Sequence, residues 1–548
     1  MRSIPDGIRE QEMNFSSVCP LTTADALGRA VILAPDVDAV VGAGRRVTYA
    51  ALDLEVNAIR KSLRHAGVSK GDHVGICLGN GADWVALFLA IGAEAAVAVP
   101  INTRLKNDEI AYALRQAKVR VLFVVDRFLN IDFIDKLRSI CPAIDAQLPD
   151  PALPTLQRIV VLGGEDAPAG AQSWRAFSED RGEPLPAPVC RPDDLLLIQY
   201  TSGTTAAPKG VMLTHRNLLA NGFFAGLRVG LRVGDRFHSA RPFFHVAGTS
   251  QSILACLQHG ATLVTMERFE AAGALQLMET ERCTHFSGND TIALMLLDHP
   301  DRSRRELSLR GAWLAASSVV AERVARELGA HEVVCAYGQS EASPNVALAC
   351  WWEPEEIRLS GRMRPQPGVE VRIRNEQGHT CAPGIEGEIQ VRGWNVMRGY
   401  FEQPEATAAV LSKDGWLATG DLGRLGEDGR LEFTGRLKDI IRVGGENVAP
   451  ADIEQTLQRH PLVRQAQVVG VPHPRLLEVP AAFVTLREGR QCSVDEILEW
   501  GRGQLAGFKA PHYLQIVQNF DFVGMTASAK VRKTELRDYA IKVFGLQA

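Results

Sequence analysis

Short runs of β-branched residues alternate with longer segments of helical periodicity along most of this chain. Residues 119–125, 158–162 and 261–265 have the composition of strands. Residues 48–66 are typical of a capped amphipathic helix, and residues 84–96 are typical of a second, buried helix. Because strands and helices alternate, the sequence predicts an α/β fold in which helices cover the sheets.

The length of 548 residues is more than one ordinary core accommodates, so we expect a large multilobed unit and a smaller one. The sequence changes character after Gly435, where the charged residues 436–439 precede a new series of compact elements. We therefore predict a domain boundary near Lys438, with a large N-terminal domain over residues 1–437 and a small C-terminal α/β domain over residues 438–548.

The C-terminal region has its own pattern of elements. A helix can begin at Pro450, and it must stop before Pro461. Strand-like runs follow at residues 465–471 and 481–486. Ser493 opens a further helix with the spacing of a capping box. This pattern is that of a second α/β unit.

Composition narrows the class of protein. Apolar residues make up 46% and charged residues 23% of the chain, which is typical of a globular protein. The formal net charge of -4, without a local basic patch, argues against a nucleic-acid partner. The ten cysteines occur singly, which suits buried thiols in a reducing cytosol better than zinc sites or disulfides.

The search for targeting segments leads to the same expectation. Residues 1–12 are polar and charged, so they lack the apolar run of a secretory signal. The longest tempting apolar stretch is residues 84–93, and a segment of that length is too short to span a bilayer. We expect a cytoplasmic protein without an integral membrane segment.

The most informative segment is residues 195–217, in which an apolar strand runs into a hydroxyl-rich loop, a lysine, a second short strand and a helix that starts near Thr214. Hydroxyls, backbone N–H groups and a lysine together form a donor cradle for phosphate oxygens. The lysine precedes a glycine, so the pattern differs from the P-loop of kinases. The candidate phosphate-binding residues are Thr201, Ser202, Gly203, Thr204, Thr205 and Lys209.

This segment closely resembles the phosphate loop of the adenylate-forming superfamily, which comprises acyl-CoA synthetases, luciferases and nonribosomal adenylation domains. One departure is Ala206, where the signature usually has glycine. Three further motifs follow in the family's order, so the resemblance extends from about Asp25 to the end of the chain. It implies a large N-terminal domain and a small, mobile C-terminal domain.

Residues 337–341 (Tyr-Gly-Gln-Ser-Glu) resemble the family's adenine and magnesium motif, although Ser340 is more often threonine. An aromatic ring beside a glycine can line a flat base, and a carboxylate can hold a magnesium ion that bridges phosphates. The resemblance implies that Glu341 is catalytic and holds Mg²⁺ together with Thr204. The implied nucleotide-binding residues of this motif are Tyr337, Gly338, Gln339 and Ser340.

Residues 415–421 resemble the ribose motif, in which Asp421 accepts hydrogen bonds from both sugar hydroxyls. Arg436, fifteen residues further on, is expected to assist at the ribose and phosphate, and Phe433 joins the nucleotide site. Residues 315–317 correspond to a strand end that flanks adenine and the acyl group. The resemblance therefore adds Ala316 and Ser317 to the nucleotide site and Ala315 to the acyl site.

The small domain carries three further implied roles. By resemblance, Lys438 is the hinge about which that domain rotates between two working poses. Gly444 and Gly445 permit the close backbone approach that the pantetheine arm of coenzyme A needs. Lys530 ends a motif that delivers the catalytic lysine, with Ala529 where glycine is usual. Without the resemblance, these lysines are typical of a solvated linker and a basic surface patch.

The acyl site is less well defined. Residues 241–248 match the family's pocket-wall segment, and His245 is expected beside the incoming carboxylate, with a core histidine bonded to backbone as the alternative. Asn289 and Gly338 are expected to line the same site together with Ala315. The small residues 315–317 leave room for a bulky or aryl acid.

The predicted activity is ATP-dependent activation of a carboxylic acid to acyl-AMP with release of pyrophosphate, followed by transfer to coenzyme A. ATP, Mg²⁺ and coenzyme A are the expected cofactors and substrates, and we expect a monomer or homodimer. Since two anions must meet, the protein has to neutralise charge. Two alternatives are an adenylation enzyme that loads a carrier-protein thiol and a noncatalytic nucleotide-binding homologue.

Overall fold

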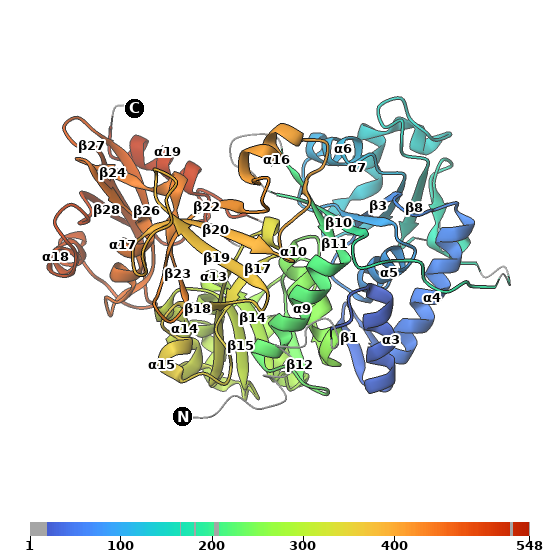
Figure 1. Ribbon diagram of the computed structural model, residues 1–548, viewed down its shortest axis with the longest axis horizontal. Coiled ribbons are helices and arrows are strands. Elements are labelled where there is room, and N and C mark those ends of the chain that lie inside the picture. Colours follow the sequence, from blue (N-terminus) through green and yellow to red (C-terminus); the bar gives the residue numbers. More distant parts are fainter. Residues whose placement is uncertain are drawn as a thin grey trace.

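The computed structural model describes residues 19–164, 166–179, 182, 184–201, 208–526 and 530–546. Figure 1 shows the elements that follow residue 440, in dark orange and red, packed at the left side of a large body that includes the blue to yellow elements and the orange helix α16. The predicted α/β fold with a large body and a small C-terminal α/β unit is confirmed.

One sheet of the large body combines early strands with three later ones. Strands β3, β4, β5 and β8 run parallel, because helices connect them. In spatial order the strands of this sheet are β21 (Gly399–Tyr400), β11 (Gly210–Thr214), β10 (Leu195–Tyr200), β4 (Val97–Pro100), β3 (His73–Cys77), β5 (Val121–Val125), β8 (Arg158–Leu162) and β9 (Gln172–Ser173).

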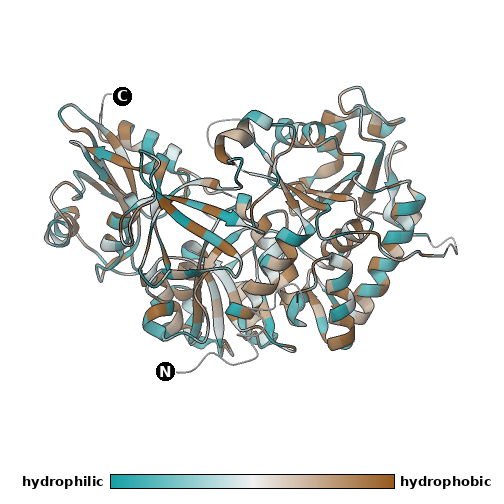
Figure 2. Ribbon diagram, viewed as in Figure 1, coloured by the Kyte–Doolittle hydropathy of each residue, from teal (hydrophilic) through white to brown (hydrophobic). Residues whose placement is uncertain are grey.

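Alternate side chains of this sheet belong to different cores, as the two-residue repeat of a strand requires. Val74, Ile76 and Phe123 pack with helices on one face, while Leu122 and Val124 pack with helices on the other. The helices on the first face are α3 (Thr23–Leu33), α4 (Tyr49–His65) and α5 (Ala82–Ala93), and those on the second are α6 (Asn107–Gln116) and α7 (Phe133–Ile140). Figure 2 shows strands of this sheet in brown and the helices around them in bands of brown and teal, as expected of helices with one apolar face.

A second, longer sheet carries most of the site described below. In order its strands are β19 (Val369–Arg374), β20 (Gly387–Gly393), β22 (Leu417–Leu425), β23 (Leu431–Arg436), β18 (Arg362–Pro365), β17 (Asn345–Leu348), β16 (Glu332–Gly338), β15 (Gly311–Ala315), β14 (His285–Asn289), β12 (Arg236–Ser239), β13 (Thr262–Val264), β1 (Asp38–Gly42) and β2 (Arg45–Thr48). Helices α5 and α9 (His215–Val229) contact strands of both sheets, so they lie between them.

The large body contains further helices. The helices are α8 (Trp174–Phe177), α10 (Val246–Gly248), the π-helix η2 (Thr249–Leu254), α11 (Ala255–His259), α12 (Ala271–Thr280), α13 (Asp290–Leu297), α14 (Ser318–Glu327), α15 (Glu355–Arg358) and α16 (Pro404–Val410). Of these, η2 and α11 pack against α9 in the interior of the body. A short hairpin is formed by β6 (Arg127–Phe128) and β7 (Ile131–Asp132), and single 3-10 turns are η1 (Pro142–Asp145), η3 (Pro300–Arg304) and η4 (Ser340–Ala342).

The C-terminal unit has its own sheet and its own cores. Its strands are β24 (Ile441–Val443), β25 (Glu446–Val448), β26 (Val463–His473), β27 (Leu477–Leu486) and β28 (Tyr513–Ile516), and its helices are α17 (Pro450–Gln458), α18 (Val494–Gln504) and α19 (Lys533–Val543). The two clusters of buried residues in this unit contain only residues after position 440. The 3-10 turn η5 (Leu437–Asp439) joins this sheet to the long sheet. The boundary near Lys438 itself stays a prediction.

Several local predictions can be compared with these elements. Thr48 accepts a hydrogen bond from the backbone N–H of Ala51, as expected of the N-cap of α4. Ser493 caps α18 in the same way, and α17 begins at Pro450. The helix predicted to continue to Ala96 was wrong at its end, because α5 stops at Ala93 and Ala95 adopts a positive φ of 55° before β4.

Among the residues that the structure describes, no helix is both long enough and apolar enough to cross a bilayer.

Candidate active site

Asp421 and Arg436 face each other across two paired strands. They are register partners of β22 and β23, so the hairpin between them explains their spacing in the sequence. The Nε of Arg436 lies 3.6 Å from a carboxylate oxygen of Asp421. Burial raises the pKa of Asp421, and Arg436 acts in the opposite direction. A buried carboxylate beside an exposed arginine suits hydroxyl groups that donate hydrogen bonds.

Two aromatic rings stand beside this pair. Tyr337, at the end of β16, stacks on Phe433 with ring centroids 5.4 Å apart and an interplanar angle of 21°. The Tyr337 hydroxyl donates a 2.9 Å hydrogen bond to Asp421. This contact links the predicted adenine motif to the predicted ribose motif. Flat aromatic surfaces of this kind can line a base.

Gly338 is required by the close approach of the backbone behind it. A Cβ at this position would lie 1.8 Å from the carbonyl oxygen of Pro344. The neighbouring Gln339 donates from its side-chain amide to the carbonyl of Thr419 at 3.5 Å. The strand end therefore turns sharply here and leads into η4, which contains Ser340 and Glu341.

Glu341 accepts a 2.9 Å hydrogen bond from the hydroxyl of Tyr400. The Nζ of Lys209 lies over the ring of Tyr400, 4.7 Å from its centroid. Thr201 donates its backbone N–H to the carbonyl of Lys209 at 3.1 Å, which closes the base of the hydroxyl-rich loop. Tyr400 therefore lies between the two groups predicted to handle phosphate and magnesium.

The predicted phosphate-binding residues Ser202, Gly203, Thr204 and Thr205 lie outside the described residues, as does Ala206. Their roles stay predictions.

Lys530 comes from the C-terminal unit and reaches the large body. Its charge interacts with four groups of that body, Arg241, Asp290, Asp421 and Arg436. Burial, then Arg436 and Arg241, lower the pKa of Lys530 to about 8, against the opposing effect of the two aspartates. Although the residue keeps exposed surface, protein groups surround its ammonium closely enough to disfavour the charge.

His245 lies within electrostatic reach of Lys530. Burial, together with Arg241 and Lys530, lowers its pKa to about 4, so the imidazole is neutral at physiological pH. Its Nδ1 accepts from the backbone N–H of Ala247 at 3.2 Å, which leaves the proton on Nε2. The predicted bond to backbone is therefore present, and a neutral Nε2–H donor remains for a ligand.

The ends of β14 and β15 bring Asp290 and Ser317 together. Asp290 accepts hydrogen bonds from both the backbone N–H and the hydroxyl of Ser317, each at 3.0 Å. Ser317 also contacts Gln458 of the C-terminal unit at 3.5 Å. Ala315 and Ala316 precede this contact at the end of β15. Burial raises the pKa of Asp290.

Asn289 has a structural duty beside its predicted acyl role. Its side-chain oxygen caps α13 by accepting from the backbone N–H of Ile292 at 3.0 Å. It is also a register partner of Ala315 in the paired strands β14 and β15. These two predicted acyl-binding residues therefore share one face of the sheet.

The remaining predicted residues lie in the C-terminal unit and its connection. Lys438 lies in η5, the single turn that joins the two sheets. Gly444 and Gly445 form the exposed turn between β24 and β25, with positive φ values of 59° and 98° that favour glycine. Their hinge and coenzyme A roles stay predictions.

Sequence reasoning missed Tyr400 as a site residue and placed Arg241 in the pocket-wall segment without giving it a role. Tyr400 lies fifteen residues before the motif at residues 415–421 and carries no local signal. Arg241 does carry one, because a charged residue opens an otherwise apolar segment before Pro242. Burial lowers the pKa of Arg241 to about 9.

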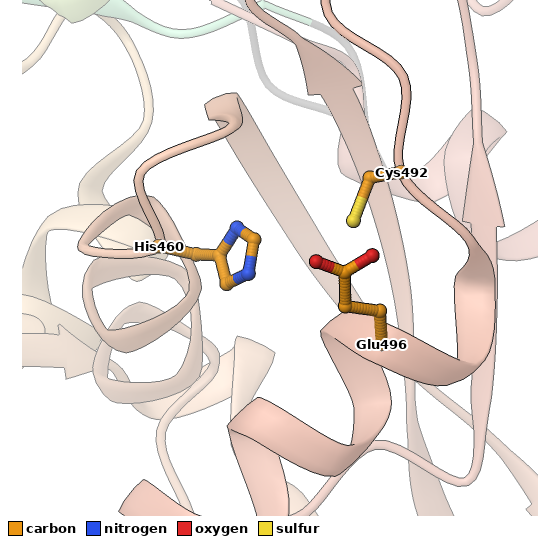
Figure 3. A group of neighbouring side chains, drawn as sticks. All are labelled: His460, Cys492 and Glu496. Atoms are coloured by element: carbon orange, nitrogen blue, oxygen red, sulfur yellow. The ribbon is translucent and has the colours of Figure 1, made fainter.

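A second group of polar side chains lies in the C-terminal unit. Figure 3 shows His460, Cys492 and Glu496 pointing toward one another, and one ligand atom of each lies within 4.8 Å of the others. However, the Nδ1 of His460 accepts from the backbone N–H of Leu462 at 3.3 Å, so Nε2 carries the proton. The Cys492 thiol, whose pKa is raised to about 11 by burial and Glu496, stays protonated. Cys492 and Glu496 share a hydrogen bond within this group.

Comparisons with known proteins identify related chains. The family model of AMP-binding enzymes matches residues 29–401, and that of the AMP-binding enzyme C-terminal domain matches residues 452–530. A Rhodococcus jostii ligase, named for coenzyme A ligation of a propanoyl group on a methylated dioxo-octahydroindene, is 36% identical over 95% of this chain and 99% of its own. The medium-chain acyl-CoA ligase ACSF2 of Danio rerio is 30% identical over 93% and 87%, respectively.

Solved structures agree with these relatives. The crystal structure of the anthranilate CoA ligase AuaEII with anthranoyl-AMP superposes with a TM-score of 0.85 and 27% identity, covering 96% of this chain and 99% of that one.

Proposed function

Since the chain belongs to the AMP-binding enzyme family and is an ATP-dependent acyl-CoA synthetase, we propose that the residues described above carry out its two half-reactions. In the first, an acid attacks the α-phosphate of ATP to give acyl-AMP and pyrophosphate. In the second, the thiol of coenzyme A attacks the acyl carbonyl, and AMP leaves.

The observation that carries this proposal is the position of Lys530. A lysine from the small unit stands among Arg241, Asp290, Asp421 and Arg436 of the large body. Attack of the carboxylate on the α-phosphate brings two anions together. A cation held beside the two reacting groups therefore lowers the barrier to this step. The described arrangement is therefore proposed as the one that forms the acyl-AMP.

The nucleotide is proposed to lie between the motifs of the large body. Asp421 accepts hydrogen bonds from the ribose hydroxyls, in place of the bond from Tyr337. Tyr337 and Phe433 line the adenine, and Arg436 reaches the ribose and α-phosphate. Lys209 and the loop before it hold the outer phosphates. The remaining predicted nucleotide contacts, Gly338, Gln339, Ser340, Ala316 and Ser317, border this region.

The acid is proposed to enter from the side of His245. Because its imidazole is neutral and its Nε2 carries a proton, His245 can orient the carboxylate by a hydrogen bond without quenching its nucleophilicity. Lys530 supplies the positive charge. Ala315, Gly338 and Asn289 are proposed to border the acyl chain.

The proposal includes a magnesium ion with the triphosphate. Glu341 fits this role, because its carboxylate accepts one bond from Tyr400 and has no lysine or arginine partner among the described residues. Such an oxygen ligand suits Mg²⁺, and Thr204 is proposed as the second ligand. When bound, the ion neutralises charge on the phosphates.

For the second half-reaction we propose rotation of the C-terminal unit about Lys438. Rotation withdraws Lys530 and brings the turn at Gly444 and Gly445 to the acyl-AMP. Two glycines leave space for the pantetheine arm.

The acid is proposed to be larger than acetate. The Rhodococcus jostii relative is named for a bicyclic propanoate, and the AuaEII structure contains anthranoyl-AMP. The test is release of AMP and formation of thioester with ATP, coenzyme A and a panel of medium-chain, aryl and bicyclic acids. Acid-dependent AMP release is expected for at least one class. Coenzyme A would be overturned as the acceptor if AMP were released without formation of acyl-CoA and a thioester formed only when a carrier-protein thiol was added.

A further inference from the structure

Arg241 is a buried arginine without an acidic partner among the described residues. Its side chain is 9% exposed. Its Nε donates to the hydroxyl of Ser287 and one Nη2 proton to the carbonyl of Gly288, both at 2.5 Å. Since a guanidinium has five N–H donors, the others have no acceptor in the described protein. A buried charge of this kind normally has a counter-charge or a ligand.

A second donor lies against it. The guanidinium of Arg241 stacks over the ring of Trp313, with its Cζ 4.2 Å from the ring centroid. The indole N–H of Trp313 is enclosed and has no hydrogen-bond partner in the described part of the chain. Two adjacent groups with unused donors therefore point to the same missing partner, a group that only accepts hydrogen bonds.

The position of these donors relative to the reacting end follows from strand register. Ser287 pairs with Trp313, and Asn289 pairs with Ala315. Side chains two residues apart share a face of the sheet, so Arg241 lies on the face of the proposed acyl residues. Its contact partners Ser287 and Trp313 lie two residues, or about 6 to 7 Å along the strands, before the strand ends at Asn289 and Ala315. Arg241 therefore suits the far end of an acyl group better than its reacting carboxylate.

We infer that Arg241 and the indole N–H of Trp313 recognise an oxygen acceptor at the far end of the acyl group, so that the preferred substrate is an acid with a distal carboxylate or ketone. This inference rests on the proposed function. A carboxylate and a ketone both present an oxygen that has lone pairs and carries no proton. Arginine donates hydrogen bonds to such an oxygen in either group, and most strongly to the charged carboxylate.

The test compares matched acids. Values of kcat/KM for thioester formation are measured for hexanoate, oxohexanoate and adipate, for heptanoate, oxoheptanoate and pimelate, and for cyclohexylpropanoate with its ring-ketone and ring-carboxylate analogues. Wild-type enzyme is expected to prefer an oxygenated acid over its alkyl counterpart by on the order of ten- to a hundredfold. Preference for the dicarboxylate identifies an anion, and preference for the oxo acid identifies a neutral carbonyl.

Three variants connect that preference to the donors. Arg241→Met should bring the ratio of kcat/KM for the oxygenated acid to that for the alkyl acid toward one, because methionine keeps an apolar side chain and lacks the guanidinium. Trp313→Phe removes only the N–H and should lower the same ratio without disturbing the fold. Arg241→Lys keeps a charge and should retain part of the preference for a dicarboxylate.

A buried arginine elsewhere provides the matched control. Arg358 is 6% exposed and donates to the carbonyls of Glu353 and Val333. Arg358→Met should lower the melting temperature and leave the acid ratio unchanged. Equal use of alkyl and oxygenated acids by the wild type, or the same ratio in Arg241→Met and Trp313→Phe, would overturn the inference alone. Absence of AMP release with every acid would overturn the proposed function and this inference with it.

Discussion

At the scale of single residues, the surroundings of Lys530 favour the binding of an anionic ligand. Two arginines and burial disfavour its charge and lower its pKa to about 8. A phosphate and a carboxylate entering between Lys530 and Arg436 would reverse that balance, because opposite charges favour the protonated form. The free site thus holds positive charge that becomes most stable when substrate is bound.

Replacement of Lys530 should separate the two half-reactions. Lys530→Ala is expected to slow adenylation by roughly 10²- to 10³-fold, the usual effect of losing a preorganised electrostatic contact. Thioester formation from preformed acyl-adenylate should continue, because that step is proposed to use the other pose. Single-turnover rates from acid plus ATP and from the acyl-adenylate, each with coenzyme A, measure the two steps.

Arg532→Ala is the matched control for that experiment, because Arg532 lies two residues away and pairs with Glu535 on the surface. It should leave both rates near wild type. Equal losses from both starting points in Lys530→Ala would contradict the proposed division of labour.

The pH dependence of adenylation should report the same lysine. The active form is protonated and its pKa in the free enzyme is about 8, so kcat/KM should fall as the pH rises past that value. His245, with a pKa of about 4, stays neutral over this range. Pyrophosphate release is measured from about pH 6 to about pH 10 in wild type and in Lys530→Arg, whose guanidinium stays charged. An alkaline fall at the same pH in both enzymes would assign it to another group.

At the scale of elements, the site is built from strand ends. Strands β14, β15 and β16 end side by side, and the paired strands β22 and β23 approach from the other side of the site through Asp421. Side chains at these ends can face a ligand while the strands behind them stay fixed by the sheet. Asn289 has both a structural and a proposed binding role, because it caps α13 and lies on the proposed acyl face.

Two substitutions at Asn289 separate capping from substrate selection. Asn289→Leu removes both the cap and the amide, so it should reduce stability by about 1 kcal/mol and change which acids are accepted. Asn289→Ser keeps a capping oxygen and should change acid preference with little loss of stability. Thermal unfolding and kcat/KM over the acid panel give the two readouts. An acid preference identical to wild type in both variants would leave Asn289 a capping residue only.

At the scale of the whole molecule, polar side chains join the two units beside the site. Arg464 of the C-terminal unit forms a 2.7 Å ion pair with Asp298, and Gln458 contacts Ser317. The connection between the sheets is the single turn η5. Partly exposed ion pairs contribute little to stability, so such an arrangement can exchange with another at small free-energy cost.

A covalent link at the ion pair should trap the described arrangement. Asp298→Cys combined with Arg464→Cys, joined by a short bifunctional thiol reagent, is expected to form acyl-AMP and pyrophosphate yet stop thioester formation. The reason is that coenzyme A is proposed to react only after rotation. Asp298→Cys alone and Arg464→Cys alone, each treated with the same reagent, control for modification of the native thiols. Thioester formation at an undiminished rate in the linked enzyme would rule out the rotation.

Local interactions made much of the architecture predictable from the sequence. Caps such as Thr48 and Ser493, and strands such as β5 and β8, depend on neighbours along the chain. The spacing of Asp421 and Arg436 belongs to the same class, because a hairpin pairs residues at a separation that the sequence itself displays. The motifs that resemble those of the adenylate-forming superfamily then predicted the reaction.

Only the tertiary structure decided which distant groups meet. Tyr400 contacts Glu341, and Arg241 stacks on Trp313, through packing of elements that are far apart in the chain. The end of α5 was likewise set by the turn that leads into β4. No local pattern records such contacts, because their free energy comes from burial and charge in the assembled fold. The position of Lys530, and with it the pose of the small unit, belongs to this second class.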